Sequence, residues 1–229
     1  MSAARARRVD GVAAGRASVL RLDGRAVDIR VRALVIGQLD ATPGPAETLV
    51  ERARRHIEAG ADAVEVRAGQ GTGLAAAVRA LRSRVEVPVG VAVDDAQQMR
   101  DAFDAGAMLM RLTETPAREV LGVAAISGST IVITDHAGDA IRLAATCGLG
   151  ADRVVVQLGA DGVGDAAIAS ALQAIPAAAQ RGCALAWCGD DPVSIACAVE
   201  LGARLVYTRA VATAAHIVRT LAAIEEAAS

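Results

Sequence analysis

The sequence contains no lysine and no asparagine, so all 24 of its basic residues are arginine. Without lysine the chain cannot form a Schiff base, attach a cofactor through a lysine amine, or build a Walker A phosphate loop. It holds one Trp, one Tyr and one Phe, too few rings to stack single-stranded nucleic acid. A formal net charge of −2 also provides no basic surface for nucleic acid. These absences exclude nucleic-acid binding and several cofactor-dependent reactions.

Signals for metals, disulfides and membranes are equally scarce. Four cysteines, Cys147, Cys183, Cys188 and Cys197, form no C-x-x-C pair and have no histidine at ligand spacing. We expect them to be small buried apolar side chains. The sequence has no run of about 18 uncharged apolar residues, the length that a membrane-spanning helix needs. Its basic N-terminus lacks the apolar segment of a secretory signal. We therefore expect a cytoplasmic protein that does not bind membranes.

Hydrophobic residues make up 53% of the 229 positions, enough for a sizeable core. A pattern in which a helical segment ends at glycine and a short apolar run follows occurs four times. The glycines are Gly60, Gly106, Gly150 and Gly202. We expect each to adopt the left-handed conformation that ends a helix before a strand. Their spacing of 44 to 52 residues is about twice a βα unit, so a second unit is expected in every interval.

Eight short apolar runs have the composition of strands, and segments of helical periodicity alternate with them. The strand candidates are residues 33–37, 63–66, 87–93, 108–112, 130–134, 153–158, 183–187 and 204–208. The helical candidates include Ala46–Ala59, Leu74–Arg84, Ala96–Ala105 and Asp165–Gln180. Strands that are apolar on both faces favour a parallel sheet covered by helices. Eight such units predict an α/β fold, the (β/α)8 TIM barrel. An open doubly wound sheet is the alternative, but no G-x-G-x-x-G motif follows its first strand.

Residues 1–31 form an N-terminal extension, and residues 32–229 form the barrel. Ala17–Leu22 and Arg25–Arg30 flank an Asp-Gly pair that is typical of a tight hairpin turn. We expect this hairpin to cap the N-terminal face of the barrel.

Function in such a barrel is located at the C-terminal ends of the strands. Three arginines, Arg67, Arg111 and Arg209, end apolar strands there, and together they suit a phosphate, a carboxylate or a planar ring. The alternative is that Glu65, Asp40 or Asp135 neutralises them as structural ion pairs. His136, at another strand end, is a candidate general base. Asp40 is a second candidate catalytic residue, and Gln157 and Asp190 are candidate ligand contacts.

Several segments in this order resemble dihydropteroate synthase, the pterin-binding barrel of folate synthesis, over roughly residues 31–225. Val35–Pro43 resembles the family's Gly-x-Leu-Asn-Val-Thr-Pro segment, and Ala59–Val66 resembles its Gly-Ala-Asp-x-Ile-Asp-Ile strand. Val87–Ala92 resembles its Val-Pro-Ile-Ser-Val-Asp strand. Ala196–Val199 and Gly202–Val211 resemble its last helix and its Arg-Val-His-Asp-Val strand. The resemblance implies a pterin-binding barrel with transferase activity.

The family's functional residues are replaced at the matching positions. Asp40 stands for the asparagine that supports metal-assisted diphosphate binding, and Ala92 for the pterin-binding aspartate. Arg111 stands for an asparagine, and Gln157 for the aspartate that hydrogen-bonds the pterin ring. Arg209 falls in the final Arg-x-His motif, which here reads Tyr207-Thr-Arg. The pterin edge requires a carboxylate acceptor pair, and neither Ala92 nor Gln157 supplies it.

We therefore expect a degenerate homologue, a pseudoenzyme whose relined mouth binds a small anionic or pterin-like ligand. The alternative is an active transferase or lyase that uses Asp40, His136 and the arginines on an anionic substrate. No cofactor is expected, except Mg²⁺ if diphosphate chemistry survives. A homodimer is compatible with the sequence.

Overall fold

A computed structural model gives the structure of the chain, and it describes residues 19–22, 25–41, 44–67, 73–112, 117–133, 137–158, 175–176 and 178–228. Eight parallel strands close into a barrel with the order β10-β3-β4-β5-β6-β7-β8-β9. The strands are β3 (Leu34–Asp40), β4 (Ala63–Arg67), β5 (Val89–Val93), β6 (Leu109–Leu112), β7 (Thr130–Ile133), β8 (Val154–Leu158), β9 (Ala184–Cys188) and β10 (Ala203–Thr208). This confirms the predicted (β/α)8 barrel.

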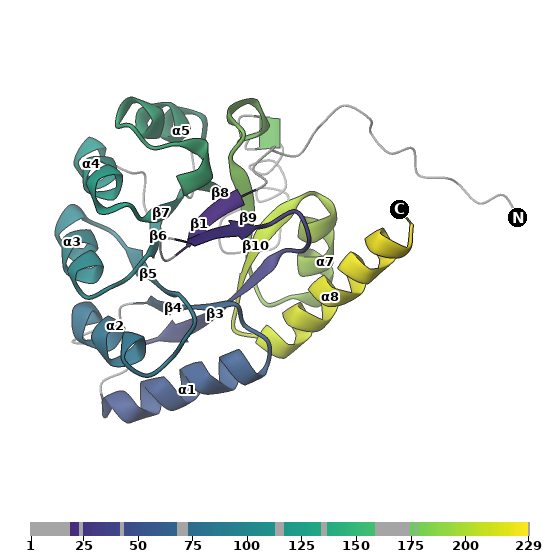
Figure 1. Cartoon of the computed structure of the whole chain (residues 1–229), viewed down its shortest axis with the longest axis horizontal. Coiled ribbons are helices and arrows are strands. Elements are labelled where there is room, and N and C mark those ends of the chain that lie inside the picture. The colour runs from purple at the N-terminus through teal and green to yellow at the C-terminus, as the bar shows by residue number, and fades with distance from the viewer. Residues whose placement is uncertain are drawn as a thin grey trace, which may run out of the picture.

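Helices surround the strands on the outside of the barrel (Figure 1). They are α1 (Ala46–Glu58), α2 (Leu74–Arg82), α3 (Ala96–Asp104), α4 (Arg118–Ser127), α5 (Ala137–Thr146), α7 (Pro192–Glu200) and α8 (Val211–Ala227). A 3₁₀ turn, η1 (Ala151–Arg153), precedes β8. The predicted helix Asp165–Gln180 falls mostly outside the described residues. No described helix has the length and apolar character that a membrane crossing requires; the cytoplasmic location and the homodimer remain predictions.

Alternation along the strands separates two apolar layers. Val64, Val91 and Ile131 are fully buried and face the helices, where they join one large cluster. Leu109 and Val155, almost fully buried, belong to a second cluster inside the barrel. These five burials follow from the two-residue period of a strand covered on both faces.

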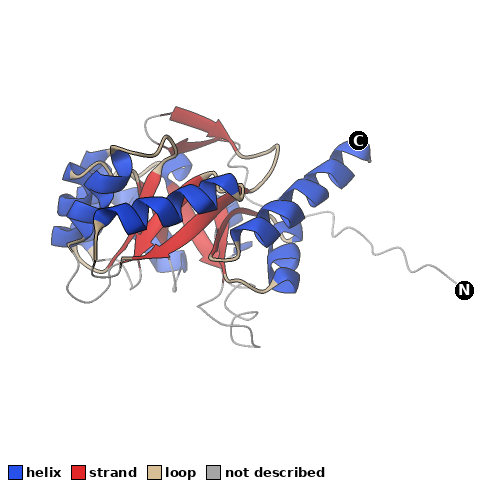
Figure 2. Ribbon diagram, turned by 90° about the horizontal axis from the view of Figure 1, so that it is seen from below, coloured by secondary structure: helices blue, strands red, loops and turns tan. Residues whose placement is uncertain are grey.

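The N-terminal hairpin closes the end of the barrel at which the strands begin. Strands β1 (Val19–Leu22) and β2 (Arg25–Asp28) pair antiparallel, and they lie at one end of the barrel (Figure 2). Leu20 and Ile29 are fully buried in the same cluster as Leu34 and Leu109 of the barrel interior. The expected capping role is thus confirmed, and it leaves the opposite, C-terminal end as the mouth.

Two sequence-based expectations are wrong. Gly60, Gly106 and Gly202 have φ near +100°, as expected for residues that end helices, but Gly150 has φ −69°. Because α5 already ends at Thr146, Gly148 adopts the left-handed conformation instead, with φ +85°. The four cysteines are also not uniformly buried. Cys183 and Cys188 are, whereas Cys147 is half-buried and Cys197 is exposed on α7.

Candidate functional site

The register of the strands places polar side chains in two levels above the apolar interior. Gln38 pairs with Glu65 across β3 and β4, and Asp40 pairs with Arg67 two residues further along. Side chains two residues apart lie on the same face of a strand. Because Leu34 and Ile36 of β3 face the barrel interior, Gln38 and Asp40 do so too. The first level is inside the barrel, and the second lies at the mouth.

The inner level is built around a buried ion pair between Glu65 and Arg111, which are 0% and 2% exposed. The guanidinium donates from Nε to Oε2 and from Nη2 to Oε1, each at 2.9 Å. The Gln38 amide donates to Oε1 at 3.0 Å. Burial alone would lower the pKa of Arg111, but the charge and hydrogen bonds of Glu65 raise it above its ordinary value. Arg111 is therefore held as a cation inside the barrel.

Tyr207 lies against this pair from β10. Its ring centroid is 5.7 Å from the Arg111 guanidinium carbon, a distance at which a cation and a ring attract. Burial, followed by the nearby charge of Glu65, raises the pKa of the Tyr207 hydroxyl well above its ordinary value. Within the described part of the chain, that buried hydroxyl has no hydrogen-bond partner. Cys188 and Gln38 contact one another on the same level, with Nε2 and Sγ 3.5 Å apart.

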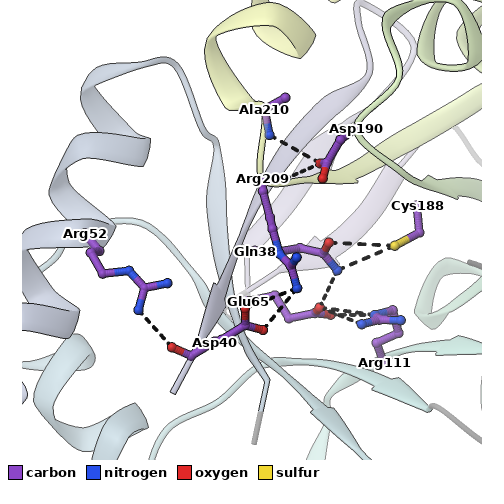
Figure 3. Close-up of polar contacts among 9 residues, drawn as sticks. All are labelled: Gln38, Asp40, Arg52, Glu65, Arg111, Cys188, Asp190, Arg209 and Ala210. Atoms are coloured by element: carbon purple, nitrogen blue, oxygen red, sulfur yellow. Dashed lines mark hydrogen bonds and ion pairs between the residues drawn. The ribbon is translucent and has the colours of Figure 1, made fainter. Parts of the chain in front are cut away.

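At the mouth, Asp40 and Arg209 form a second ion pair of different geometry. A single nitrogen, Nη2 of Arg209, donates to Oδ1 at 3.3 Å and lies 3.1 Å from Oδ2. The side chains are 46% and 53% exposed, respectively. Figure 3 shows this pair together with the inner cluster of Gln38, Glu65 and Arg111. The mouth pair is accessible to a ligand in solution, whereas the inner pair is not.

Helix α1 supports the end of strand β3 that carries Asp40. The pairing of β3 with β10 ends at Gly37 and Thr208, so the last residues of β3 extend beyond their neighbour on that edge. Nη1 of Arg52 donates to the backbone carbonyl of Asp40 at 3.0 Å there (Figure 3). His56 packs closely on Gly37, where an added Cβ would lie 3.0 Å from the His56 Cβ. The Arg52 side chain thus takes the place of the missing strand partner at the Asp40 carbonyl.

Asp190, after β9, is engaged by the turn between β10 and α8. Its Oδ1 accepts from the Thr208 hydroxyl at 2.7 Å, from the Arg209 N–H at 2.6 Å and from the Ala210 N–H at 3.3 Å. Partial burial would raise the pKa of Asp190, but these hydrogen bonds and the charge of Arg209 lower it. The Asp190 carboxylate therefore accepts hydrogen bonds from the backbone N–H groups just before the first turn of α8.

The remaining predicted site residues are only partly placed. Arg67 ends β4 half-buried, and among the residues that the structure describes none forms an ion pair with it. Gln157 is buried in β8. His136 and Asp135 lie outside the described residues. Two of the ion pairs weighed from the sequence are present, Arg111 with Glu65 and Arg209 with Asp40.

Sequence reasoning did not find the supporting residues. Gln38 was not predicted to bind Glu65, and Arg52 was not singled out, because a helical arginine ordinarily faces solvent. Arg52 lies 12 residues after Asp40, a spacing with no local periodicity. Only the barrel topology brings α1 back against β3. Within the described part of the chain, no three His, Cys, Asp or Glu side chains gather as a metal site.

No protein-family model and no curated protein sequence matches this chain. Solved structures do match it. A Burkholderia cenocepacia dihydropteroate synthase complexed with 7,8-dihydropteroate is 20% identical with a TM-score of 0.77, and the match covers 92% of this chain and 98% of that chain. A Xanthomonas albilineans dihydropteroate synthase with 4-aminobenzoic acid is 17% identical with a TM-score of 0.77, over 91% and 98%.

The Mycobacterium tuberculosis protein Rv1207 is 21% identical with a TM-score of 0.75, over 90% of this chain and 97% of that chain. The similarity therefore extends along nearly the whole length of each protein, although few residues are shared. The chain has the fold of the dihydropteroate synthases.

Proposed function

We propose that this chain is a dihydropteroate synthase-like barrel that binds a small anionic or pterin-like ligand at its mouth and does not synthesise dihydropteroate. The observation that carries the proposal is the state of Glu65. This carboxylate faces the barrel interior, and both of its oxygens are already bonded to Arg111 and Gln38.

The edge of a pterin ring presents N–H donors in an arrangement similar to a guanidine, and a carboxylate is the acceptor that matches it. In this barrel Arg111 already donates to Glu65 through two nitrogens. A pterin ring would need the same two-nitrogen arrangement to bind this carboxylate. Ala92 on β5 offers no side-chain acceptor, and Gln157 on β8 carries no charge. These residues support the proposal that this barrel lacks the carboxylate with which the synthases bind the pterin ring.

The mouth favours an anion. Asp40 is next to Arg67 in the register of β3 and β4, and it is ion-paired with Arg209 across the opening between β3 and β10. Arg67 and Arg209 thus stand on either side of Asp40, and the Asp190 carboxylate is held by backbone N–H groups beside Arg209. Guanidinium groups bind phosphate and carboxylate through charge-assisted hydrogen bonds.

The mouth does not fit Mg²⁺. Asp40, the residue at the family's metal-supporting position, is bonded to a cation at 3.1 Å. Asp190 is bonded to backbone N–H groups and to a hydroxyl. Magnesium is held by carboxylates together with waters or substrate phosphates, and Arg209 would repel it from Asp40. The proposed function therefore does not involve Mg²⁺.

A second candidate function is an active enzyme on an anionic substrate. The observation that favours it is the accessibility of the Asp40 carboxylate at the end of the barrel where TIM-barrel chemistry takes place. Asp40 would act as acid or base, as the sequence predicts for His136 also, and the arginines would hold the substrate. In that case replacing Asp40 removes turnover and leaves substrate affinity nearly unchanged.

The experiment combines an activity assay with binding measurements. Purified protein is given the pterin pyrophosphate, 4-aminobenzoate and Mg²⁺, and we expect no dihydropteroate above background. Turnover at about 10 per second, the median for enzymes, would contradict the proposal. In parallel, the melting temperature is measured with phosphate, 4-aminobenzoate or 7,8-dihydropteroate. A ligand that binds the folded state raises it in proportion to ln(1 + [L]/Kd). No rise with any of the three would contradict ligand binding at the mouth.

A further inference from the structure

We infer that the chain binds a small organic cation, an ammonium or guanidinium group on a short apolar chain, in a cavity beside its N-terminal hairpin. The cavity measures about 360 Å³, within the range of about 300–1,000 Å³ that is typical of small-molecule sites. Asp62 and Pro88 on its wall precede β4 and β5, so it lies at the end of the barrel opposite the mouth. The inference goes beyond the proposed function and does not depend on it.

The floor of the cavity is apolar. Leu22 of β1 and Leu34 of β3 line it and belong to the cluster inside the barrel, and Val27 of β2 packs against that cluster. Val31, between β2 and β3, also lines the cavity and is 71% exposed. A ligand that covers Val31 removes apolar surface from water, which favours binding. The hairpin and the barrel together thus offer a surface for the apolar part of a ligand.

Two ion pairs fix the charged part of the wall. Nη1 of Arg32 donates to Oδ2 of Asp62 at 2.8 Å, and the same oxygen accepts from the Val35 N–H at 2.9 Å. Asp28 accepts from Nε of Arg30 at 3.0 Å and from Nη2 at 2.6 Å. Each of these two carboxylates is therefore already balanced by an arginine of the protein.

Glu86 supplies the charge that selects a cation. It lines the cavity and is exposed, and its side chain has no ion pair or hydrogen bond within the described part of the chain. Arg84, two residues earlier, pairs with Glu47 at 3.2 Å instead. When every charged group on the wall is counted together with Arg30, the two pairs cancel and Glu86 leaves a single negative charge.

One free carboxylate beside an apolar floor identifies the ligand class. A metal ion does not fit, because Ca²⁺ and Mg²⁺ take several oxygen ligands, and Glu86 is the one unpaired carboxylate among the lining residues. An ammonium or guanidinium group forms a charge-assisted hydrogen bond with a single carboxylate. Its apolar chain then lies along Leu22, Val27 and Val31.

The test compares ligands that differ in charge or length by NMR titration of the full chain. The ligands are hexylammonium, butylammonium, hexanol and hexanoate. We expect hexylammonium to shift the amide signals of Leu22, Val27, Val31 and Glu86 saturably. Hexanol should bind about two- to fivefold more weakly, the factor that corresponds to an exposed ion pair, and hexanoate more weakly still. Butylammonium, which is two methylene groups shorter, should bind up to about 15-fold more weakly than hexylammonium.

Three variants assign the two parts of the site. Glu86→Gln keeps the length of the side chain and should reduce the affinity for hexylammonium to that for hexanol. Val31→Ser removes apolar wall at an exposed position, so it should fold normally and weaken all four ligands. Glu200→Gln is the matched control, because it removes an exposed carboxylate where α7 ends, at the same end of the barrel and outside the cavity. It should leave every affinity unchanged.

Three results would overturn the inference. The first is the absence of a saturable shift of the cavity signals with hexylammonium. The second is binding of hexanol or hexanoate as tight as that of hexylammonium, and the third is an equal loss in Glu86→Gln and Glu200→Gln. Melting temperatures confirm that the variants are folded. The ligands of the mouth are tested separately, so failure of the proposed function would leave this result standing.

Discussion

The inner and outer ion pairs of the barrel join the same chemical groups, yet they differ in burial and geometry. Glu65 and Arg111 are nearly inaccessible to solvent and bond through two nitrogens at 2.9 Å. Asp40 and Arg209 are about half exposed and bond through one nitrogen at 3.1 to 3.3 Å. An exposed pair contributes about 0.2–1 kcal/mol, so the outer pair can exchange. A buried pair cannot lose one partner without leaving an uncompensated charge. Burial therefore decides which arginine is structural and which is available to a ligand.

The largest expected effect comes from breaking the inner pair. Arg111→Ala leaves Glu65 buried without its cation, which should lower the free energy of unfolding by about 3–5 kcal/mol. For a chain of this length that corresponds to a fall in melting temperature of roughly 6–20 °C. Thermal and urea denaturation measure it. A loss below about 1 kcal/mol, the range of exposed pairs, would mean that the inner pair does not differ from the outer one.

The double variant Glu65→Gln with Arg111→Met is the matched control. It removes both charges, and it keeps a side-chain acceptor for the Gln38 amide, which donates to Glu65 at 3.0 Å. Because replacing a whole buried pair is often neutral, we expect it to recover most of the stability that Arg111→Ala loses. A double variant as unstable as Arg111→Ala would show that packing around Arg111, and not the unpaired charge, causes the loss.

A smaller effect is expected at Asp190, where the mouth is fixed by a carboxylate of lowered pKa. Such a group stabilises the fold fully above its ordinary pKa of 3.8, and this contribution disappears as the pH falls through the lowered value of the folded state. Asp190→Asn keeps an oxygen acceptor but cannot ionise. The stability difference between the natural protein and Asp190→Asn should therefore shrink as the pH falls below about 4. Denaturation across that range measures it, and a difference independent of pH would contradict the role of the charge.

Much of the fold was predictable from local patterns. The eight strands follow from apolar runs that recur between helical segments, and three of the four chosen glycines have the expected positive φ. The prediction for Gly150 is wrong because two glycines lie close together in the sequence. Since α5 ends at Thr146, Gly148 is the glycine that adopts the left-handed conformation. A pattern of residue types cannot choose between two neighbouring glycines, whereas the length of a packed helix can.

The candidate site was less predictable. Strand ends identified Arg111 and Arg209 as members of one group, although one side chain turns into the barrel and the other remains at the mouth. Which arginine is buried depends on the acceptor available at its level. Glu65 faces inward on β4, and Asp40 is the last residue of β3, at the mouth. That information lies in the register between strands distant in sequence, as does the contact of Arg52 with Asp40.

The most direct measurement is the phosphate-dependent rise in melting temperature, compared between Arg209→Ala and the double variant Glu65→Gln with Arg111→Met. Arg209→Ala removes the outer pair, so it should change stability without phosphate by less than about 1 kcal/mol and lose the phosphate response. The double variant should keep that response, because the inner pair does not contact the ligand. A response that survives in Arg209→Ala, or that disappears in the double variant, would contradict the division between a structural inner pair and a ligand-binding outer pair.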